Sequence, residues 1–186
     1  KRSRDDTTPA NRLQALSRAF MPGPLHPATC TIIIRMETPE FKTVGIVGAG
    51  AMGRGIAQIA AQAGSKVLLF DTQADAVAKA RESVAAQWDK LVEKGRIDAA
   101  AATAQKERLQ PAATLADLAP CDLIVEAIVE RLDVKKGLFA ELEGIVQTTA
   151  VLATNTSSLS VTAIAAGLKC PQQFAGFHFF NPVPLM

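Results

Sequence analysis

A histidine and a glycine-rich loop are the residues of this chain with the clearest chemical potential. The histidine, His178, lies in the segment Phe-His-Phe-Phe-Asn-Pro at 177–182, and the loop has the pattern Gly-x-Gly-x-x-Gly at 48–53. Because an imidazole can take up a proton near neutral pH, His178 is a candidate general base. A histidine among aromatic residues can equally be a packed residue with satisfied nitrogens. The loop favours the catalytic interpretation, since it predicts a nicotinamide dinucleotide beside the base.

The glycine loop has the sequence context of a dinucleotide-binding turn. Residues 42–47 are expected to form a short buried strand and residues 52–63 a helix, so the loop connects the two. The first glycine permits the turn, the second lets the backbone approach a pyrophosphate, and the third allows close packing of helix and strand. The phosphates would lie at the helix N-terminus. The residues expected to contact the cofactor here are Gly48, Gly50, Ala51, Met52 and Gly53. The alternative is an ordinary glycine-rich turn.

A carboxylate follows the second predicted strand. Residues 66–70 end at Asp71, which is about the expected distance downstream of the loop for an acid that binds the adenosine ribose hydroxyls. No arginine stands beside Asp71 to bind a 2′-phosphate, so the predicted cofactor is NAD rather than NADP. The alternative is that Asp71 caps a helix that begins near Ala74.

Composition bounds the class of protein. A chain of 186 residues that is 48% hydrophobic can bury one substantial core. No apolar run approaches the length of a membrane span, and a net charge of +2 without a basic patch does not indicate nucleic-acid binding. Cys30, Cys121 and Cys170 form no CxxC pair, so no disulfide framework or metal site is predicted, and the latter two are expected to be packing or loop residues. We expect a cytoplasmic protein.

The first 35 residues differ from the rest of the chain. They contain many basic residues, only two acidic ones and four prolines, without sustained periodicity, which predicts a disordered leader at 1–35 before one domain at 36–186. One interpretation is sequence translated upstream of a natural start at Met36. The other is a mitochondrial transit peptide, against which Asp5 and Asp6 count.

Hydrophobic periodicity predicts strands that alternate with helices. The expected strands lie at 42–47, 66–70, near 109, and at 122–126, 150–154 and 174–179, and the expected helices at 52–63, 76–95, 97–108, 132–146 and 161–166. This order predicts an α/β fold: a Rossmann-type, doubly wound parallel sheet with a helical-hairpin insertion at 74–108. Ligands bind such sheets beyond the carboxyl ends of the strands, where the polar candidates gather: Gly48, Asp71, Glu126 to Glu130, Asn155 to Ser158 and His178.

From Phe41 to Met186 the chain resembles the N-terminal domain of the L-3-hydroxyacyl-CoA dehydrogenase family. The motifs that carry the resemblance are GAGAMGRGIA at 48–57, VEAIVE at 125–130, NTSSL at 155–159 and FHFFNPVP at 177–184. The resemblance implies NAD-dependent oxidation of (S)-3-hydroxyacyl-CoA to 3-oxoacyl-CoA.

The resemblance also implies roles for single residues. His178 would take the proton from the 3-hydroxyl group, and Ser157 would hydrogen-bond the substrate oxygen. Glu130, Lys135 and Asn181 match family positions near the cofactor, and Lys94 matches a lysine that meets the coenzyme A nucleotide.

Each of these positions has a plain alternative. Glu130 suits the first turn of a helix, Lys135 can be solvated, Asn181 before Pro182 can be a turn residue, and Ser157 can cap the following helix. Gln87 stands where some relatives carry serine at the coenzyme A contact.

The family pattern extends beyond Met186, to a glutamate that orients the histidine and a helical domain that closes over the thioester and forms a homodimer. The sequence is therefore expected to supply the cofactor-binding part, with little activity of its own. An apolar patch is expected to be uncovered where the second domain docks, made of Phe179, Phe180, Val183, Leu185 and Met186. A non-catalytic dinucleotide-binding module is the alternative. Dehydrogenases of the hydroxyisobutyrate or phosphogluconate type are disfavoured, because they rely on a catalytic lysine and lack the histidine segment.

Overall fold

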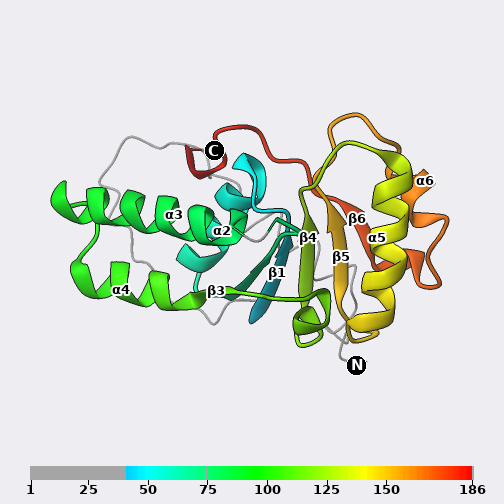
Figure 1. Cartoon of the computed structure of the whole chain (residues 1–186), viewed down its shortest axis with the longest axis horizontal. Coiled ribbons are helices and arrows are strands. Elements are labelled where there is room, and N and C mark those ends of the chain that lie inside the picture. Colours follow the sequence, from blue (N-terminus) through cyan, green and yellow to red (C-terminus); the bar gives the residue numbers. More distant parts are fainter. Residues whose placement is uncertain (1–40, 74, 186) are drawn as a thin grey trace, which may run out of the picture.

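The computed structural model describes residues 41–73 and 75–185. Its centre is one parallel sheet of six strands in the order β3-β2-β1-β4-β5-β6 (Figure 1). The strands are β1 Thr43–Val47, β2 Lys66–Phe70, β3 Leu109–Pro111, β4 Leu123–Glu126, β5 Val151–Thr154 and β6 Phe174–Gly176. This order and direction confirm the predicted Rossmann-type fold. The predicted leader at 1–35 and Cys30 lie outside the described residues.

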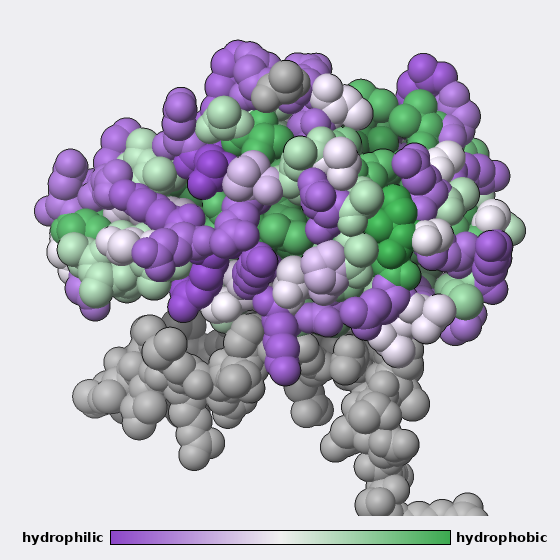
Figure 2. All heavy atoms as spheres, turned by 60° about the horizontal axis from the view of Figure 1, so that its bottom comes forward, coloured by the Kyte–Doolittle hydropathy of each residue, from purple (hydrophilic) through white to green (hydrophobic). Residues whose placement is uncertain are grey.

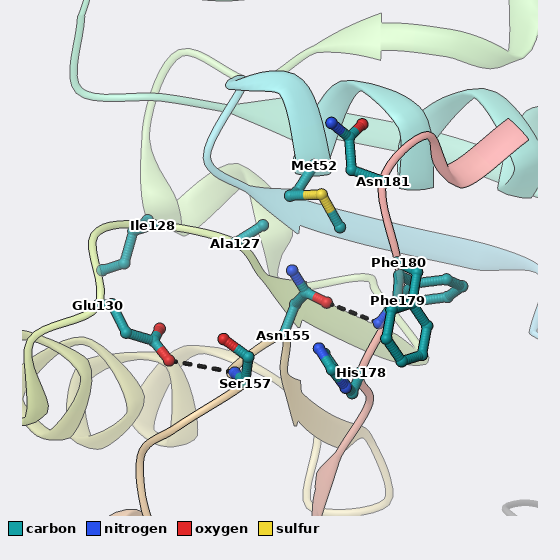
Figure 3. Close-up of a pocket in the computed structure, with 10 residues that line it drawn as sticks. All are labelled: Met52, Ala127, Ile128, Glu130, Asn155, Ser157, His178, Phe179, Phe180 and Asn181. Atoms are coloured by element: carbon teal, nitrogen blue, oxygen red, sulfur yellow. Dashed lines mark hydrogen bonds between the residues drawn. The ribbon is translucent and has the colours of Figure 1, made fainter.

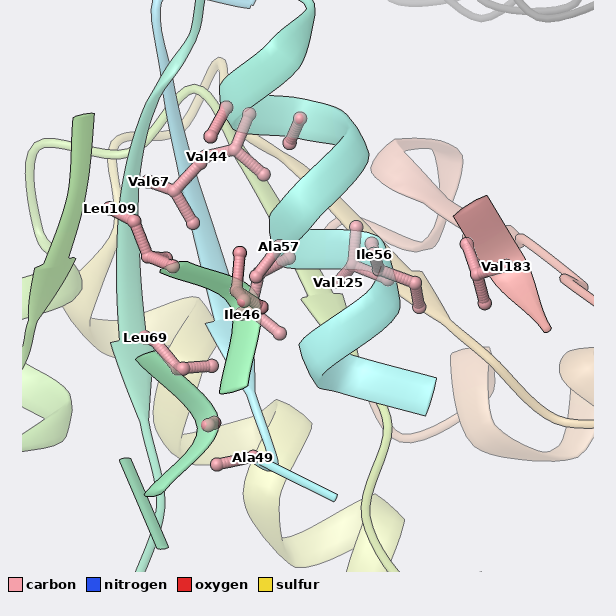
Figure 4. Close-up of a cluster of buried hydrophobic side chains, with 14 of the residues drawn as sticks. Val44, Ile46, Ala49, Ile56, Ala57, Val67, Leu69, Leu109, Val125 and Val183 are labelled. Carbon is pink, nitrogen blue, oxygen red and sulfur yellow. The ribbon is translucent and has the colours of Figure 1, made fainter. Parts of the chain in front are cut away.

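Residues of β1, β2, β4 and β5 enter two separate cores, because successive side chains of a strand point to opposite faces of the sheet. Ile46, Leu69 and Val125 pack on one face with helix α2 (Ala51–Gln62), as Figure 4 shows. The other face is covered by α5 (Leu132–Ile145) and α6 (Val161–Ala165). Strands buried on both faces need apolar residues at consecutive positions, which is why β1, β4 and β5 lack an apolar and polar alternation.

Helices α3 (Ala76–Glu93) and α4 (Ala99–Arg108) form the predicted hairpin, which projects from the β3 side of the sheet (Figure 1). The N–H groups of Gly95 and Arg96 return to the carbonyls of Val92 and Leu91, and Gly95 has φ +63°, so a Schellman turn ends α3 as its glycine predicted. Trp88 is fully buried, as expected. Hydrophilic side chains extend over the hairpin in Figure 2, and no helix in the described part is long and apolar enough to span a membrane.

Several predicted boundaries differ from the structure by one to three residues, and two of the differences have a clear physical reason. Helix α4 begins at Ala99 rather than at 97, because the Asp98 carboxylate caps it by accepting the Ala101 N–H at 2.6 Å. Strand β6 ends at Gly176 rather than at 179. Its partner β5 ends at Thr154, and the N–H of Phe179 instead donates to the Asn155 side chain. The residues around His178 are therefore a loop beyond the sheet edge.

Phe179, Phe180 and Val183 do not form one exposed patch, and the side chain of Leu185 and all of Met186 lie outside the described part of the chain. Val183 is 2% exposed and packs against α2, where a Cβ placed on Gly55 would lie 2.8 Å from the Val183 Cβ (Figure 4). Phe179 is half-buried, and only Phe180 of these three residues is exposed, at 59%. The expectation that Val183 is exposed is wrong, because the glycine in α2 leaves a groove that admits it.

Candidate active site

The glycine loop has the geometry that its sequence predicts. Gly48 adopts φ +105°, a conformation that side chains rarely tolerate, and its N–H donates to the Phe70 carbonyl at 2.8 Å. A Cβ on Gly53 would lie 1.7 Å from the Gly48 carbonyl oxygen, whereas a Cβ on Gly50 would have no atom within 4 Å. Gly50 therefore faces open space at the N-terminus of α2, where unpaired N–H groups favour an anion. The alternative of an ordinary turn explains none of this close packing.

These two glycines give a prediction with two separate readouts. Gly53→Ala is expected to destabilise the fold by about 1 to 3 kcal/mol, because a methyl group would overlap the Gly48 carbonyl and force the helix away from the strand. Gly50→Ala is expected to leave stability within about 0.5 kcal/mol and to weaken NADH binding, because its methyl group would fill the space a pyrophosphate needs. Urea unfolding and NADH titration separate the two effects. Equal loss of stability in both variants would contradict this assignment.

Asp71 lies beside the loop and helps to hold it. One carboxylate oxygen accepts the Ala49 N–H at 2.7 Å, and the other accepts the Gln73 N–H at 2.9 Å. The cap of α3 is Asp75 rather than Asp71, so the helix-cap alternative for Asp71 is wrong. Each carboxylate oxygen can accept further hydrogen bonds, which leaves Asp71 able to bind ribose hydroxyls.

A pocket of about 330 Å³ opens beyond the carboxyl ends of β4, β5 and β6, next to the first turn of α2 (Figure 3). Its walls come from four segments that are distant in sequence. The residues that line it are Met52, Ala127, Ile128, Glu130, Asn155, Ser157, His178, Phe179, Phe180 and Asn181. Five of the candidate residues from the sequence therefore lie together in this pocket: Met52, Glu130, Ser157, His178 and Asn181. Parallel strands end at one edge of the sheet, which is what collects these residues.

Glu130 holds the loop that carries Ser157. Its Oε1 accepts a hydrogen bond from the Thr156 hydroxyl group and from the backbone N–H groups of Ser157 (3.1 Å) and Ser158 (3.4 Å). Lys135 Nζ lies 3.2 Å from Oε2. Burial raises the pKa of Glu130, but hydrogen bonds from Thr156 and Lys135 and the lysine charge outweigh it and lower the pKa to about 2. Glu130 precedes the N-cap of α5, so the alternative that places it in the first turn of that helix is wrong.

Stability should depend on pH through Glu130. Its pKa falls from an ordinary 4.5 to about 2 on folding, so its contribution is present above pH 4.5 and is lost as pH falls toward 2. Wild type should therefore be more stable than Glu130→Gln at pH 7, with the difference shrinking below pH 4.5. Urea midpoints measured along this pH series provide the test. A difference that stays constant from pH 7 to pH 2.5 would contradict the assignment.

Lys135 is fully buried and links two carboxylates. Its Nζ lies 2.6 Å from Glu126 Oε1, and Glu126 is itself fully buried. Glu126 also accepts hydrogen bonds from the Thr154 hydroxyl group and the Ile128 N–H, both at 2.6 Å. The alternative that Lys135 is solvated is wrong, because Lys135 lies on the same buried side of α5 as Phe139 and Leu142. Lys135 does not line the pocket and reaches it through Glu130. Glu126 is one of the polar residues expected at the sheet edge, but its pairing with Lys135 was not predicted, because it depends on how α5 packs against β4.

Ser157 is exposed at the pocket and does not cap the next helix. Ser160 caps α6, since its Oγ accepts the Ala163 N–H at 3.2 Å. The cap alternative for Ser157 is therefore wrong, which leaves its hydroxyl group available to a ligand.

His178 lies across the pocket from Glu130, with its ring 4.7 Å from the Phe180 ring. It is exposed, so the alternative of a packed, satisfied histidine is wrong. Asn181 lines the same pocket and also lies in a bend of the chain at 181–182, as its turn alternative expects. Lys94 is not part of this group: it caps the C-terminus of α3 at the exposed tip of the hairpin (Figure 1). Cys121 is buried, and burial raises the pKa of its thiol to about 12, as suits a packing residue.

The sheet order, the glycine turn and a pocket beside the switch from β1 to β4 define a dinucleotide-binding domain of the Rossmann type. Comparison with known proteins gives the family. Residues 43–186 match the NAD binding domain of 3-hydroxyacyl-CoA dehydrogenase, and the chain belongs to this family.

Relatives share this region and continue beyond it. The chain is 45% identical over 147 residues to 3-hydroxyadipyl-CoA dehydrogenase of Escherichia coli K12, covering 79% of this chain and 31% of that protein. It is 42% identical over 146 residues to 3-hydroxybutyryl-CoA dehydrogenase of Bradyrhizobium diazoefficiens, covering 78% and 50%. The chain therefore spans a third to a half of these relatives.

Solved structures agree with the fold. The crystal structure of 3-hydroxybutyryl-CoA dehydrogenase from Escherichia coli K12 superposes with a TM-score of 0.77 at 44% identity, covering 78% of this chain and 31% of that one. The (S)-3-hydroxybutyryl-CoA dehydrogenase from Ralstonia eutropha gives a TM-score of 0.75 at 40% identity, covering 78% and 52%.

Proposed function

We propose that the protein oxidises (S)-3-hydroxyacyl-CoA thioesters to 3-oxoacyl-CoA with NAD, and that residues 36–186 form its cofactor-binding part. The observation that carries the proposal is that Met52, Ser157 and His178 line one pocket beside the glycine loop. Relatives named as 3-hydroxyadipyl-CoA and 3-hydroxybutyryl-CoA dehydrogenases support the substrate class.

The pocket residues divide the chemistry between them. His178 takes the proton of the substrate 3-hydroxyl group, and Ser157 donates a hydrogen bond to the same oxygen. NAD, when bound, accepts the hydride that leaves C3, so the carbon is oxidised by two electrons and one proton remains on the histidine. The carboxylate of Glu130 positions Ser157 by accepting the backbone N–H of Ser157, and the ion pair with Lys135 positions Glu130.

The described residues fit a dinucleotide along the sheet edge. A pyrophosphate suits the open space at Gly50, and Asp71 stands on the β2 side of the loop for the adenosine ribose. The pocket on the β4 side is left for the nicotinamide, near Asn181. Lys94 and the hairpin lie outside this path, and the coenzyme A nucleotide is the role that the family resemblance implies for Lys94.

A cofactor preference follows from Asp71. The chain is expected to bind NADH more tightly than NADPH, because the carboxylate accepts ribose hydroxyls and repels a 2′-phosphate. Asp71→Ala should cost NADH binding about 1.5 to 3 kcal/mol, the value of hydrogen bonds to a charged group. Fluorescence titration with both cofactors measures this. Gln73→Ala is the control, because only its backbone contacts Asp71. Equal binding of NADPH would overturn the assignment.

A non-catalytic dinucleotide-binding module is the second candidate. The observation in its favour is that the His178 ring lies against the Phe180 ring, and no carboxylate forms a hydrogen bond or ion pair with it among residues 41–73 and 75–185. Both candidates require NADH binding, and only the first requires NADH production from 3-hydroxybutyryl-CoA. Loss of NADH binding would exclude both.

A further inference from the structure

Asn155 joins two parts of the pocket through one end of its amide. It directly follows β5, and its Oδ1 accepts the backbone N–H of Phe179 at 2.9 Å. A backbone N–H can only donate, so the amide oxygen must face Phe179, and this contact settles the orientation of the amide group. The bond ties the residue next to His178 to the loop after β5.

The other end of the Asn155 amide faces the pocket. Figure 3 shows Nδ2 on the side away from Phe179, toward Met52 and Ala127. Within the described ranges, Nδ2 donates to no protein acceptor. Two N–H bonds are therefore directed into the space between the glycine loop and the histidine, where they favour an acceptor oxygen over an apolar group.

The position of Asn155 selects the ligand group that it would meet. A dinucleotide whose pyrophosphate lies at Gly50 must extend past Met52 to bring its ring to His178. Figure 3 shows Asn155 between Met52 and His178. The part of the cofactor that crosses this space is the nicotinamide riboside, which offers ribose hydroxyl and carboxamide oxygens.

We infer that Asn155 is a binding and positioning residue: Nδ2 donates to an oxygen of the nicotinamide riboside half, while Oδ1 holds the backbone beside His178. This inference rests on the proposed NAD site and names a residue that the motifs did not assign to it. The two functions belong to opposite ends of one amide, so different substitutions separate them.

The ligand contact is tested by Asn155→Asp in the 186-residue chain. The new carboxylate keeps an oxygen that can accept the Phe179 N–H. It replaces the two N–H donors of Nδ2 with a second, negatively charged oxygen, which repels the oxygen atoms of the ligand. NADH affinity should fall at least about tenfold, whereas affinity for ADP, which lacks the nicotinamide riboside, should change less than about twofold. NADH is the better probe, because the positive ring of NAD⁺ would attract the carboxylate and mask the loss.

Gln172→Glu is the matched control, since it makes the same change of charge at an exposed amide before the amino end of β6. It should bind NADH as wild type does. Unchanged NADH affinity in Asn155→Asp, or an equal loss for ADP, would overturn the inference while leaving the proposed NAD site intact. Wild type that binds no NADH would overturn the proposed site first.

The positioning role is tested by hydrogen exchange at the Phe179 N–H. Asn155→Ala removes the acceptor and should speed exchange at least about tenfold, whereas Asn155→Asp should keep it slow. Exchange at Ala153 inside β5 serves as an internal reference for global stability. Slow exchange at Phe179 in Asn155→Ala would show that the amide does not hold this segment.

Discussion

Replacing His178 with alanine is expected to lower the rate of 3-hydroxybutyryl-CoA oxidation by about 10² to 10⁴, the range for loss of a general base. The effect should fall on kcat, because proton transfer belongs to the transition state and not to cofactor binding. The fall in kcat is measured from NADH production by a form of the protein that carries the activity. The 186-residue chain should be assayed beside it.

The control for this experiment is cofactor affinity. His178→Ala should bind NADH within about twofold of wild type, because the expected contacts to the pyrophosphate and the adenosine ribose come from the glycine loop and Asp71 and not from the imidazole. Retained NADH binding with lost turnover would identify the imidazole as the base. An active His178→Ala protein would remove the histidine from its role, and the pocket would then favour the binding-module candidate.

Lys135→Met is expected to destabilise the fold by about 3 to 5 kcal/mol, the cost of leaving a buried charge without its partner. Lys135 and Glu126 are both fully buried and 2.6 Å apart, and Glu130 would lose its cation as well. Urea unfolding followed by the fluorescence of Trp88, which is buried and is the single tryptophan of the chain, measures the change.

The neighbouring lysine supplies the matched control. Lys136 is exposed on the same helix, so Lys136→Met should change stability by less than about 0.5 kcal/mol. The double variant Glu126→Gln with Lys135→Met should recover part of the loss, because it removes both buried charges at Glu126 and Lys135 together. Equal effects of the two lysine variants would show that the buried pair does not support the fold.

Several features of this protein follow from local sequence alone. The glycine at 48 marks a turn because other residues disfavour φ +105°, and Gly95 ends α3 for the related reason that its φ is positive. Strand and helix positions follow from periodicity, since each element must bury one stripe or face. The gathering of Ser157 and His178 at one edge follows from the parallel order of the strands, which their alternation with helices already predicts.

Other features needed the tertiary structure, because they depend on which distant atoms meet. The Lys135 side chain is polar by type, and only its approach to Glu126 and Glu130 shows that it is a buried link instead of a solvated cation. The amide of Asn155 meets the backbone of Phe179 across 24 residues, and this contact decides both where β6 stops and which way the amide points. Periodicity predicts which side of an element is buried. The hydrogen-bond partners of a polar side chain depend on how the elements pack against one another, and the local sequence does not determine that packing.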